Sequence, residues 1–155
     1  MDSIVMLCTD GSELALHALK QSLPLLAPAD RTIVVTVSSP VDPALETGSG
    51  FMTGAWDAGG IQNIVTSGDE AAKKILDETV TALGLENAEL MSIVGSPGPA
   101  IVDLAASLPA SVVVIGTSGR GGFRRAMVGS TSDHIVRNAV CPVLAQGAGH
   151  EDAPA

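Results

Sequence analysis

Residues 112–120 read Val-Val-Val-Ile-Gly-Thr-Ser-Gly-Arg, and residues 129–132 read Gly-Ser-Thr-Ser. The four apolar residues that open the stretch predict a buried strand. A glycine-rich basic segment follows, and a helix is expected to begin with Ser130 as its N-cap. Segments of this kind bring bare backbone N–H groups close to phosphate oxygens. The stretch therefore predicts an anion site between a strand and a helix.

The charge distribution favours the same interpretation. The chain has a net charge of −9, yet four of its eight basic residues fall in and just after this stretch, at Arg120, Arg124, Arg125 and Arg137. Only Asp133 opposes them there. A local cationic spot on an acidic protein predicts a small anionic ligand, whereas the overall acidity argues against a nucleic-acid surface. The chain also has only three aromatic residues on which bases could stack.

Length and composition predict one globular domain over residues 1–146, followed by a disordered tail at 147–155. The two cysteines, Cys8 and Cys141, lie in apolar stretches and are expected to be buried free thiols in a reducing compartment. Met1-Asp2-Ser3 does not resemble the start of a signal peptide, and the apolar runs are short for a membrane span. We therefore expect a cytoplasmic protein without a membrane partner.

Strands and helices are expected to alternate along the chain. Strands are predicted at 4–8, 32–37, 89–94, 112–115 and 143–145. Helices are predicted from Glu13, over 72–83 and over 130–138, and Pro99 suits the first turn of a further helix that runs towards Leu108. Asp10 or Ser12 would cap the first helix, whose buried face is expected at Leu16, Leu19 and Leu23. This order predicts an α/β fold: one open, mainly parallel five-stranded sheet with helices on both faces. Ligands of such sheets bind beyond the carboxyl ends of the strands.

The glycine spacing excludes two common phosphate loops. No Lys follows the glycines as a Walker loop requires, and the first strand–helix turn, Thr9-Asp10-Gly11-Ser12, lacks the dinucleotide fingerprint. What remains is Gly116-x2-Gly119-x9-Gly129-Ser130. Gly119 would allow a close backbone approach, and the helix after Gly129 would present free N–H groups. The hydroxyls of Ser130, Thr131 and Ser132 would add donors on the same side.

This spacing resembles the G-2x-G-9x-G-[ST] signature of the ATP-binding branch of the universal stress protein family. The opening Val5–Ser12 segment, the Gly95-Ser96-Pro97 helix entry and the closing Cys141-Pro142-Val143-Leu144 strand are similar to the family's in the same order. The resemblance covers residues 3–146. It implies a Rossmann-like fold of the adenine nucleotide alpha hydrolase type, ATP as the ligand with Mg²⁺ as a possible companion, and a homodimer paired through Val143–Ala145.

The resemblance also implies roles for individual residues. Asp10 would lie near the ribose and adenine, with backbone contacts from Cys8 and Thr9, and Val37 would flank the adenine. The residues that would line the ribose and phosphates are Ile115, Gly116, Ser118, Gly119 and Arg120, and those that would hold the phosphates are Gly129, Ser130, Thr131 and Ser132. Ser111, Ser118 and Thr131 depart from the residues common in the family.

ATP binding in a regulatory, stress-response module is the function we expect, with no catalytic residue. Three alternatives stay open: a weak ATPase, a sensor of AMP or cyclic AMP, and a scaffold that binds a protein through Pro40–Gly60. Efficient phosphoryl transfer would need a positioned cation, a metal site and a group that orients the nucleophile. No general base for such a step is evident in the sequence, and no histidine pair has metal-ligand spacing.

Overall fold

The computed structural model describes residues 1–38, 70–117 and 129–147. Five strands form one sheet in the order β3-β2-β1-β4-β5, and every pair of neighbours is parallel. Their bounds are β1 Ile4–Cys8, β2 Arg31–Ser38, β3 Glu89–Val94, β4 Val112–Gly116 and β5 Val143–Gln146. The predicted α/β fold with a five-stranded parallel sheet is confirmed.

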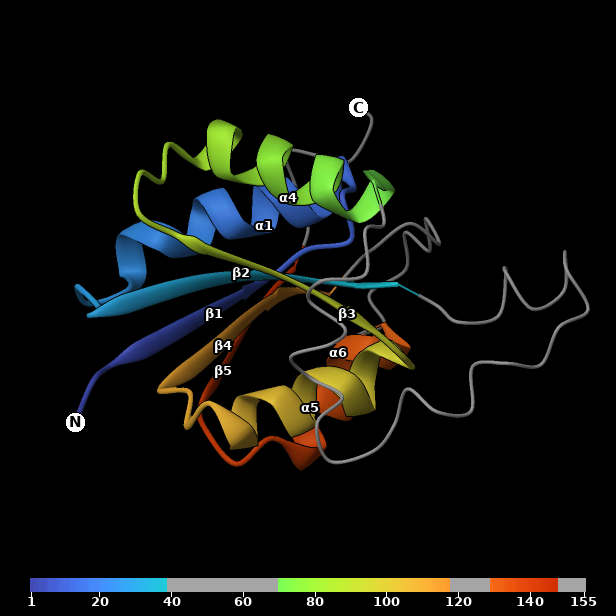
Figure 1. Cartoon of the computed structure of the whole chain (residues 1–155). Coiled ribbons are helices and arrows are strands. Elements are labelled where there is room, and N and C mark those ends of the chain that lie inside the picture. Colours follow the sequence, from blue (N-terminus) through green and yellow to red (C-terminus); the bar gives the residue numbers. More distant parts are fainter. Residues whose placement is uncertain (39–69, 118–128, 148–155) are drawn as a thin grey trace, which may run out of the picture.

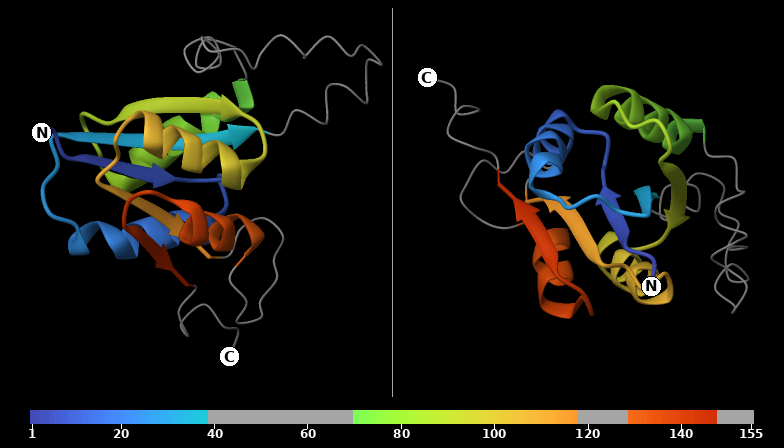
Figure 2. Two further views of the ribbon diagram at one scale, coloured as in Figure 1. Left: turned by 90° about the horizontal axis from the view of Figure 1, so that it is seen from below. Right: turned by 90° about the vertical axis from the view of Figure 1, so that its left-hand side faces the viewer.

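Helices cover both faces of the sheet (Figure 1). On one face lie α1 (Glu13–Ser22) and α4 (Glu70–Leu83), and on the other lie α5 (Pro97–Ser107) and α6 (Ser130–Asn138). A short 3₁₀ helix, η1 (Leu23–Leu25), extends α1. Figure 2 shows the same three layers from below and from the side.

Each face of the sheet carries its own core, because successive residues of a strand point to opposite faces. Met6 and Val35 belong to the cluster under α5 and α6, whereas Leu7 and Val34 belong to the cluster under α1 and α4. Strand β1 lies at the centre of the sheet, and all five of its residues are buried. Helices cover both faces of the sheet at β1, so every residue of this strand is buried and its sequence is continuously apolar.

One local prediction for the helices was wrong in part. The first helix buries Leu19 as predicted, but Leu16 is only half-buried, and Ala15 and Ala18 supply the rest of the buried face. Another helix begins at Pro97, which puts Pro99 in its first turn, as predicted. Proline fits at the start of α5 because the first helical residue needs no intrahelical N–H bond.

The order of the strands predicts where a ligand-binding crevice would lie, a position called the crevice below. From β1 the chain moves outward to β2 and β3, and it later returns beside β1 to form β4 and β5. The sheet therefore reverses its strand order between β1 and β4. In an open parallel sheet this is where ligands bind, beyond the carboxyl ends of the two strands.

Candidate functional site

The predicted site residues that the structure describes gather at the carboxyl ends of the strands. Cys8 ends β1, with Thr9 and Asp10 in the turn that follows it, and Ile115 and Gly116 end β4. Val37 lies near the end of β2, and Gly129 precedes the first turn of α6, which contains Ser130, Thr131 and Ser132. Ser118, Gly119 and Arg120 lie outside the described residues, as does Pro40–Gly60.

The turn after β1 is folded by its own side chains. The Thr9 N–H donates to the carbonyl oxygen of Val35 at 2.9 Å, which ties the turn to β2. The Thr9 hydroxyl oxygen accepts from the Gly11 N–H at 3.1 Å, and Asp10 Oδ1 accepts from the Ser12 N–H at 2.9 Å. Asp10 is therefore held in one orientation at the mouth of the crevice.

Helix α1 begins directly after this turn. The cap is Ser12, one of the two predicted candidates, because its hydroxyl oxygen accepts from the Ala15 N–H at 3.1 Å. Gly11 has a φ of +81°, a conformation that side chains disfavour. A Cβ at Gly11 would lie 2.8 Å from Ile75 Cγ1 of α4. The turn needs glycine both for its backbone conformation and for the close approach of α4.

Main-chain groups of β2 face the crevice. The N–H and C=O of one strand residue point to the same side, and those of the next residue to the other side. The Val35 carbonyl points to β1, since it accepts from Thr9, and the Ser38 carbonyl points to the β3 side, since it accepts from the Gly95 N–H. The N–H and C=O of Val37 therefore point to the β1 side. Strand β1 has already ended there, at Cys8 opposite Val35.

The backbone of Thr117 joins three parts of the site. Its N–H donates to the carbonyl oxygen of Gln146 at 3.0 Å, which extends the pairing of β4 with β5. Its carbonyl oxygen accepts from the Gly129 N–H at 2.9 Å. Gly116 and Gly129, the first and third glycines of the motif, are thus held close together. Nothing in the sequence indicated this role, because both hydrogen bonds are made by the main chain of Thr117 and any residue type other than proline could make them.

The N-terminus of α6 points its donors into this region. Gly129 is the N-cap, with extended backbone, and its carbonyl oxygen accepts from the Asp133 N–H at 2.8 Å. The N–H groups of Ser130, Thr131 and Ser132 precede that bond and have no acceptor within the helix. Together with the helix dipole they favour a bound anion. The prediction of Ser130 as the cap was wrong by one residue, since Ser130 is already helical.

The hydroxyl of Ser132 does not act as predicted. The Ser132 residue is 2 % exposed, and its hydroxyl donates back to the Gly129 carbonyl oxygen at 3.0 Å. Its proton is therefore directed at the helix backbone and not outward to a ligand. Ser132 instead reinforces the cap, while Ser130 is exposed and Thr131 is half-buried.

Gly129 is required by its surroundings and not by its φ of −60°. A Cβ at this position would lie 2.9 Å from the Thr117 carbonyl oxygen and 3.7 Å from Ser132 Oγ. The carbonyl belongs to the backbone, which cannot turn aside as a side chain could. Any larger residue must therefore displace the start of α6 or the end of β4.

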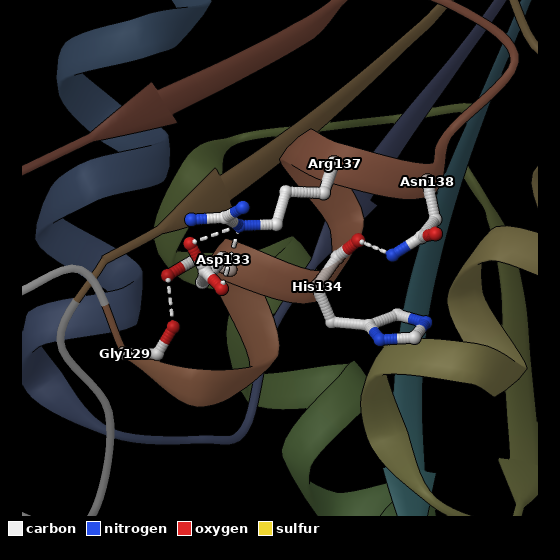
Figure 3. Close-up of polar contacts among 6 residues, drawn as sticks. Gly129, Asp133, His134, Arg137 and Asn138 are labelled. Carbon is white, nitrogen blue, oxygen red and sulfur yellow. Dashed lines mark hydrogen bonds and ion pairs between the residues drawn. The ribbon is translucent and has the colours of Figure 1, made fainter.

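Of the four arginines in the predicted cationic spot, the structure describes Arg137. Arg137 lies in the last turn of α6 and pairs with Asp133, with Nε 2.9 Å from Oδ1 and 3.0 Å from Oδ2 (Figure 3). The hydrogen bond to Asp133 raises the pKa of the Arg137 guanidinium. This pair is locally neutral, so Arg137 does not add a net positive charge. Arg120, Arg124 and Arg125 lie outside the described residues.

The cysteines are free thiols, as predicted, but only Cys8 is buried. Burial raises the pKa of the Cys8 thiol to about 12, with a smaller contribution from Cys141. The pKa of Cys141, which is half-buried, is also raised by desolvation. A thiol with a raised pKa stays protonated at neutral pH and is a poor nucleophile. Cys8 therefore contributes packing to the site.

The described residues also bear on metal binding and on insertion into a membrane. Within residues 1–38, 70–117 and 129–147, no group of three or more His, Cys, Asp or Glu side chains is placed to hold a metal ion. None of the helices in these same ranges has the length and apolar character to cross a membrane.

Comparison with known proteins adds independent information. Residues 1–145 match the universal stress protein family. A universal stress protein of Methanocaldococcus jannaschii is 28% identical over 142 residues, a match that covers 90% of this chain and 79% of the relative. A second universal stress protein, from Thermus aquaticus, is 33% identical over 75 residues, which is 48% of this chain and 55% of the relative.

Solved structures share the fold. The hypothetical protein MJ0577 superposes with a TM-score of 0.71 at 21% identity, over 97% of this chain and 99% of that one. A universal stress protein in complex with cAMP gives 0.60 at 20% identity, over 94% and 97% of the two chains. A universal stress protein family protein from Arabidopsis thaliana with AMP bound gives 0.62 at 15% identity, over 99% and 96%. With the family match spanning nearly the whole sequence, this chain belongs to the universal stress protein family.

Proposed function

We propose that this chain binds ATP in the crevice between β1 and β4 and acts as a regulatory module of the stress response. The observation that carries the proposal is the N-terminus of α6, which directs the N–H groups of Ser130, Thr131 and Ser132 beyond the end of β4. Such a terminus favours phosphate through its free donors and its dipole. Two structural neighbours, those with cAMP and with AMP, hold adenine nucleotides and so support this class of ligand.

The base and ribose would occupy the other half of the crevice. The N–H and C=O of Val37 point to the side where β1 has ended, and a donor next to an acceptor suits the edge of an adenine ring. Asp10, fixed by its bond to the Ser12 N–H, would lie near the ribose. Ile115 and Gly116 would line the floor, and Ser118, Gly119 and Arg120 would follow the phosphates as the resemblance implies.

The described chemistry favours binding over turnover. Efficient phosphoryl transfer needs a positioned cation and metal ions that neutralise the developing charge. In the described part of the chain, the charged pair on α6 is Asp133 with Arg137, and each neutralises the other. Any Mg²⁺ would be held mainly by the phosphates of the nucleotide, and Asp10, in the turn after β1, would be a candidate carboxylate ligand.

The proposal is tested by identifying what the protein carries. Freshly purified protein is denatured, and the released nucleotide is identified by mass spectrometry. ATP in near-stoichiometric amount is the expected result, and competition binding with ATP, ADP, AMP and cAMP then ranks the ligands. Preferential binding of AMP or cAMP would support the sensor alternative, and steady turnover above about one per second would support an enzyme.

A variant in the glycine motif provides a second test. Gly119→Val is expected to remove at least two charge-assisted phosphate contacts, each worth roughly 1.5–3 kcal/mol, and so to weaken ATP binding at least about a hundredfold. Gly84→Ala is a suitable control, because a Cβ there has no atom within 4 Å and Gly84 lies outside the crevice. Unchanged affinity in a folded Gly119→Val variant would remove this glycine from the site.

We also propose that the chain acts in the cytoplasm as a homodimer paired through Val143–Ala145. Strand β5 lies at one edge of the described sheet, and an unpaired edge favours strand addition. Val136 and Val140 beside it are 53 % and 74 % exposed, so apolar surface accompanies this edge. Sedimentation of the chain with Ala145→Pro, which should block pairing at the edge, would test the arrangement. A dimer that survives this change would exclude β5 as its interface.

A further inference from the structure

The first two turns of α6 contain a carboxylate that ought to oppose an anion at the N-terminus. Asp133 lies one residue after the three N–H groups that have no acceptor within the helix. An acidic side chain near this end is favourable for the helix itself, because it faces the positive end of the dipole. The same charge would repel a phosphate bound at Ser130–Ser132, so the two roles conflict.

Arg137 removes the conflict in this structure. Its Nε lies at 2.9 and 3.0 Å from the two oxygens of the Asp133 carboxylate, one helical turn further from the N-terminus (Figure 3). His134, the residue after Asp133, points away from it toward α5 (Figure 3), where a Cβ at Gly98 would lie 2.9 Å from the His134 Cβ. Within the described residues, the charge of Asp133 is therefore balanced by Arg137.

We propose that Arg137 is a positioning residue for nucleotide binding: it neutralises Asp133 and holds its carboxylate along the helix, away from the phosphate-binding donors. The inference rests on the proposed binding of nucleotide at the start of α6. Arg137 itself lies in the last turn of the helix and need not touch the ligand. Its effect is transmitted through Asp133 and scales with the negative charge of the nucleotide.

The test is a double-mutant cycle measured with ATP, AMP and adenosine. Arg137→Gln frees the Asp133 carboxylate and is expected to weaken ATP binding about threefold to tenfold, AMP binding less, and adenosine binding not at all. Asp133→Asn in the Arg137→Gln background removes the repelling charge and should restore the ATP affinity. Arg137→Lys keeps the positive charge and should retain most of the affinity. The difference between ATP and AMP should shrink in high salt.

A matched control separates this effect from a change in total charge. Lys74 and Glu78 form a second i, i+4 ion pair, on α4, with 3.8 Å between Nζ and Oε1. Lys74→Gln changes the net charge of the protein as Arg137→Gln does, and it is expected to leave ATP binding unchanged. The thermal midpoints of both variants show whether loss of an exposed pair alters the fold, which is expected to be a small effect.

The outcomes distinguish this inference from the proposed function. Equal ATP affinity for the unaltered chain and Arg137→Gln would overturn the role of Arg137 while nucleotide binding stands. A loss that Asp133→Asn fails to restore, or that is equal for ATP and adenosine, would also overturn it. Failure of the unaltered chain to bind any of the three ligands would overturn the proposed function itself, and with it this inference.

Discussion

The two ends of the sheet differ in how completely their polar groups are hydrogen-bonded within the protein. At the amino ends of the strands, polar groups bond to one another: the Ser3 N–H and hydroxyl donate to Asp30 Oδ2, and Arg31 donates to both oxygens of Glu89. At the carboxyl ends some polar groups are also paired, as Asp10 is with the Ser12 N–H, but the N–H groups of Ser130, Thr131 and Ser132 have no acceptor within α6, and the main chain of Val37 faces the side where β1 has ended. Groups that are already paired stabilise the fold, whereas groups that are held in place with their donors turned outward are suited to a ligand.

Among the residues that the structure describes, the largest effect is expected from Gly129→Ala at the carboxyl end. The added Cβ would lie 2.9 Å from the Thr117 carbonyl oxygen, so the start of α6 must shift and its N–H groups lose their alignment. We expect ATP affinity to fall at least about tenfold, measured by isothermal titration, since about 1.4 kcal/mol corresponds to that ratio. Gly84→Ala, with its φ of +67°, is the control: it should lower stability and leave affinity unchanged. Equal affinity for the two variants would contradict the comparison.

Ser12, which caps α1 at the carboxyl end of the sheet, should contribute to the stability of the fold. Ser12→Ala removes the oxygen that accepts from the Ala15 N–H at 3.1 Å. Loss of such a cap typically costs about 1 kcal/mol, which is about 2–4 °C in the thermal midpoint of a chain of this length. Denaturant unfolding measures the change. Ser12→Asp, which can cap the helix as well, should restore the midpoint, and a failure to do so would mean that the cap is not the cause.

Ser111→Ala tests whether a hydrogen-bonded group at the amino end of the sheet contributes to stability alone. The Ser111 hydroxyl oxygen accepts from the Ile4 N–H at 3.0 Å, and its own N–H donates to the Ile4 carbonyl oxygen at 2.8 Å. Removing the hydroxyl should lower the free energy of unfolding by roughly 0.5–1.5 kcal/mol. ATP affinity should not change, because Ser111 precedes the amino end of β4 and the crevice lies beyond the other end. A loss of affinity would show that the two ends are coupled.

The smallest effect is expected in acid, again at the amino end. The hydrogen bond from Arg31 lowers the pKa of Glu89 from its ordinary value of 4.5, and hydrogen bonds from Ser3 lower that of Asp30 from 3.8. Because the folded-state pKa values are depressed, this stabilisation is present above the unfolded pKa values and is lost as the pH falls through the folded ones. Thermal midpoints should therefore decline below about pH 4.5. Glu89→Gln should reduce the decline slightly, since the pair is exposed to solvent.

Much of the fold could be predicted from the sequence because the strands are short apolar runs. Ile4–Cys8 and Glu89–Val94 have the predicted bounds, and the other three strands extend one or two residues beyond the prediction. Burial on both faces forces continuous apolar sequence on the central strands, so their positions are conspicuous. Helix faces were less predictable, since α1 packs through Ala15 and Ala18, whose small side chains give a weak periodic signal.

The site was predicted in position but not in its hydrogen bonds. Glycine spacing located the start of α6, yet the cap proved to be Gly129, which makes no side-chain capping bond and therefore lacks the residue type by which a cap is usually predicted. The inward-directed hydroxyl of Ser132 depends on local helix geometry that residue type does not reveal. By contrast, the pairing of Arg137 with Asp133 follows from their i, i+4 spacing and could have been read from the sequence.

The bond between the Thr117 carbonyl and the Gly129 N–H has an evolutionary consequence. The chain leaves β4 and enters α6 at nearly one point in space, since these two atoms are 2.9 Å apart. The alignment of β4, β5 and α6 is therefore secured by main-chain bonds at the two ends of the intervening segment and does not depend on its length. Selection on the glycine spacing would then act through the ligand and not through the scaffold.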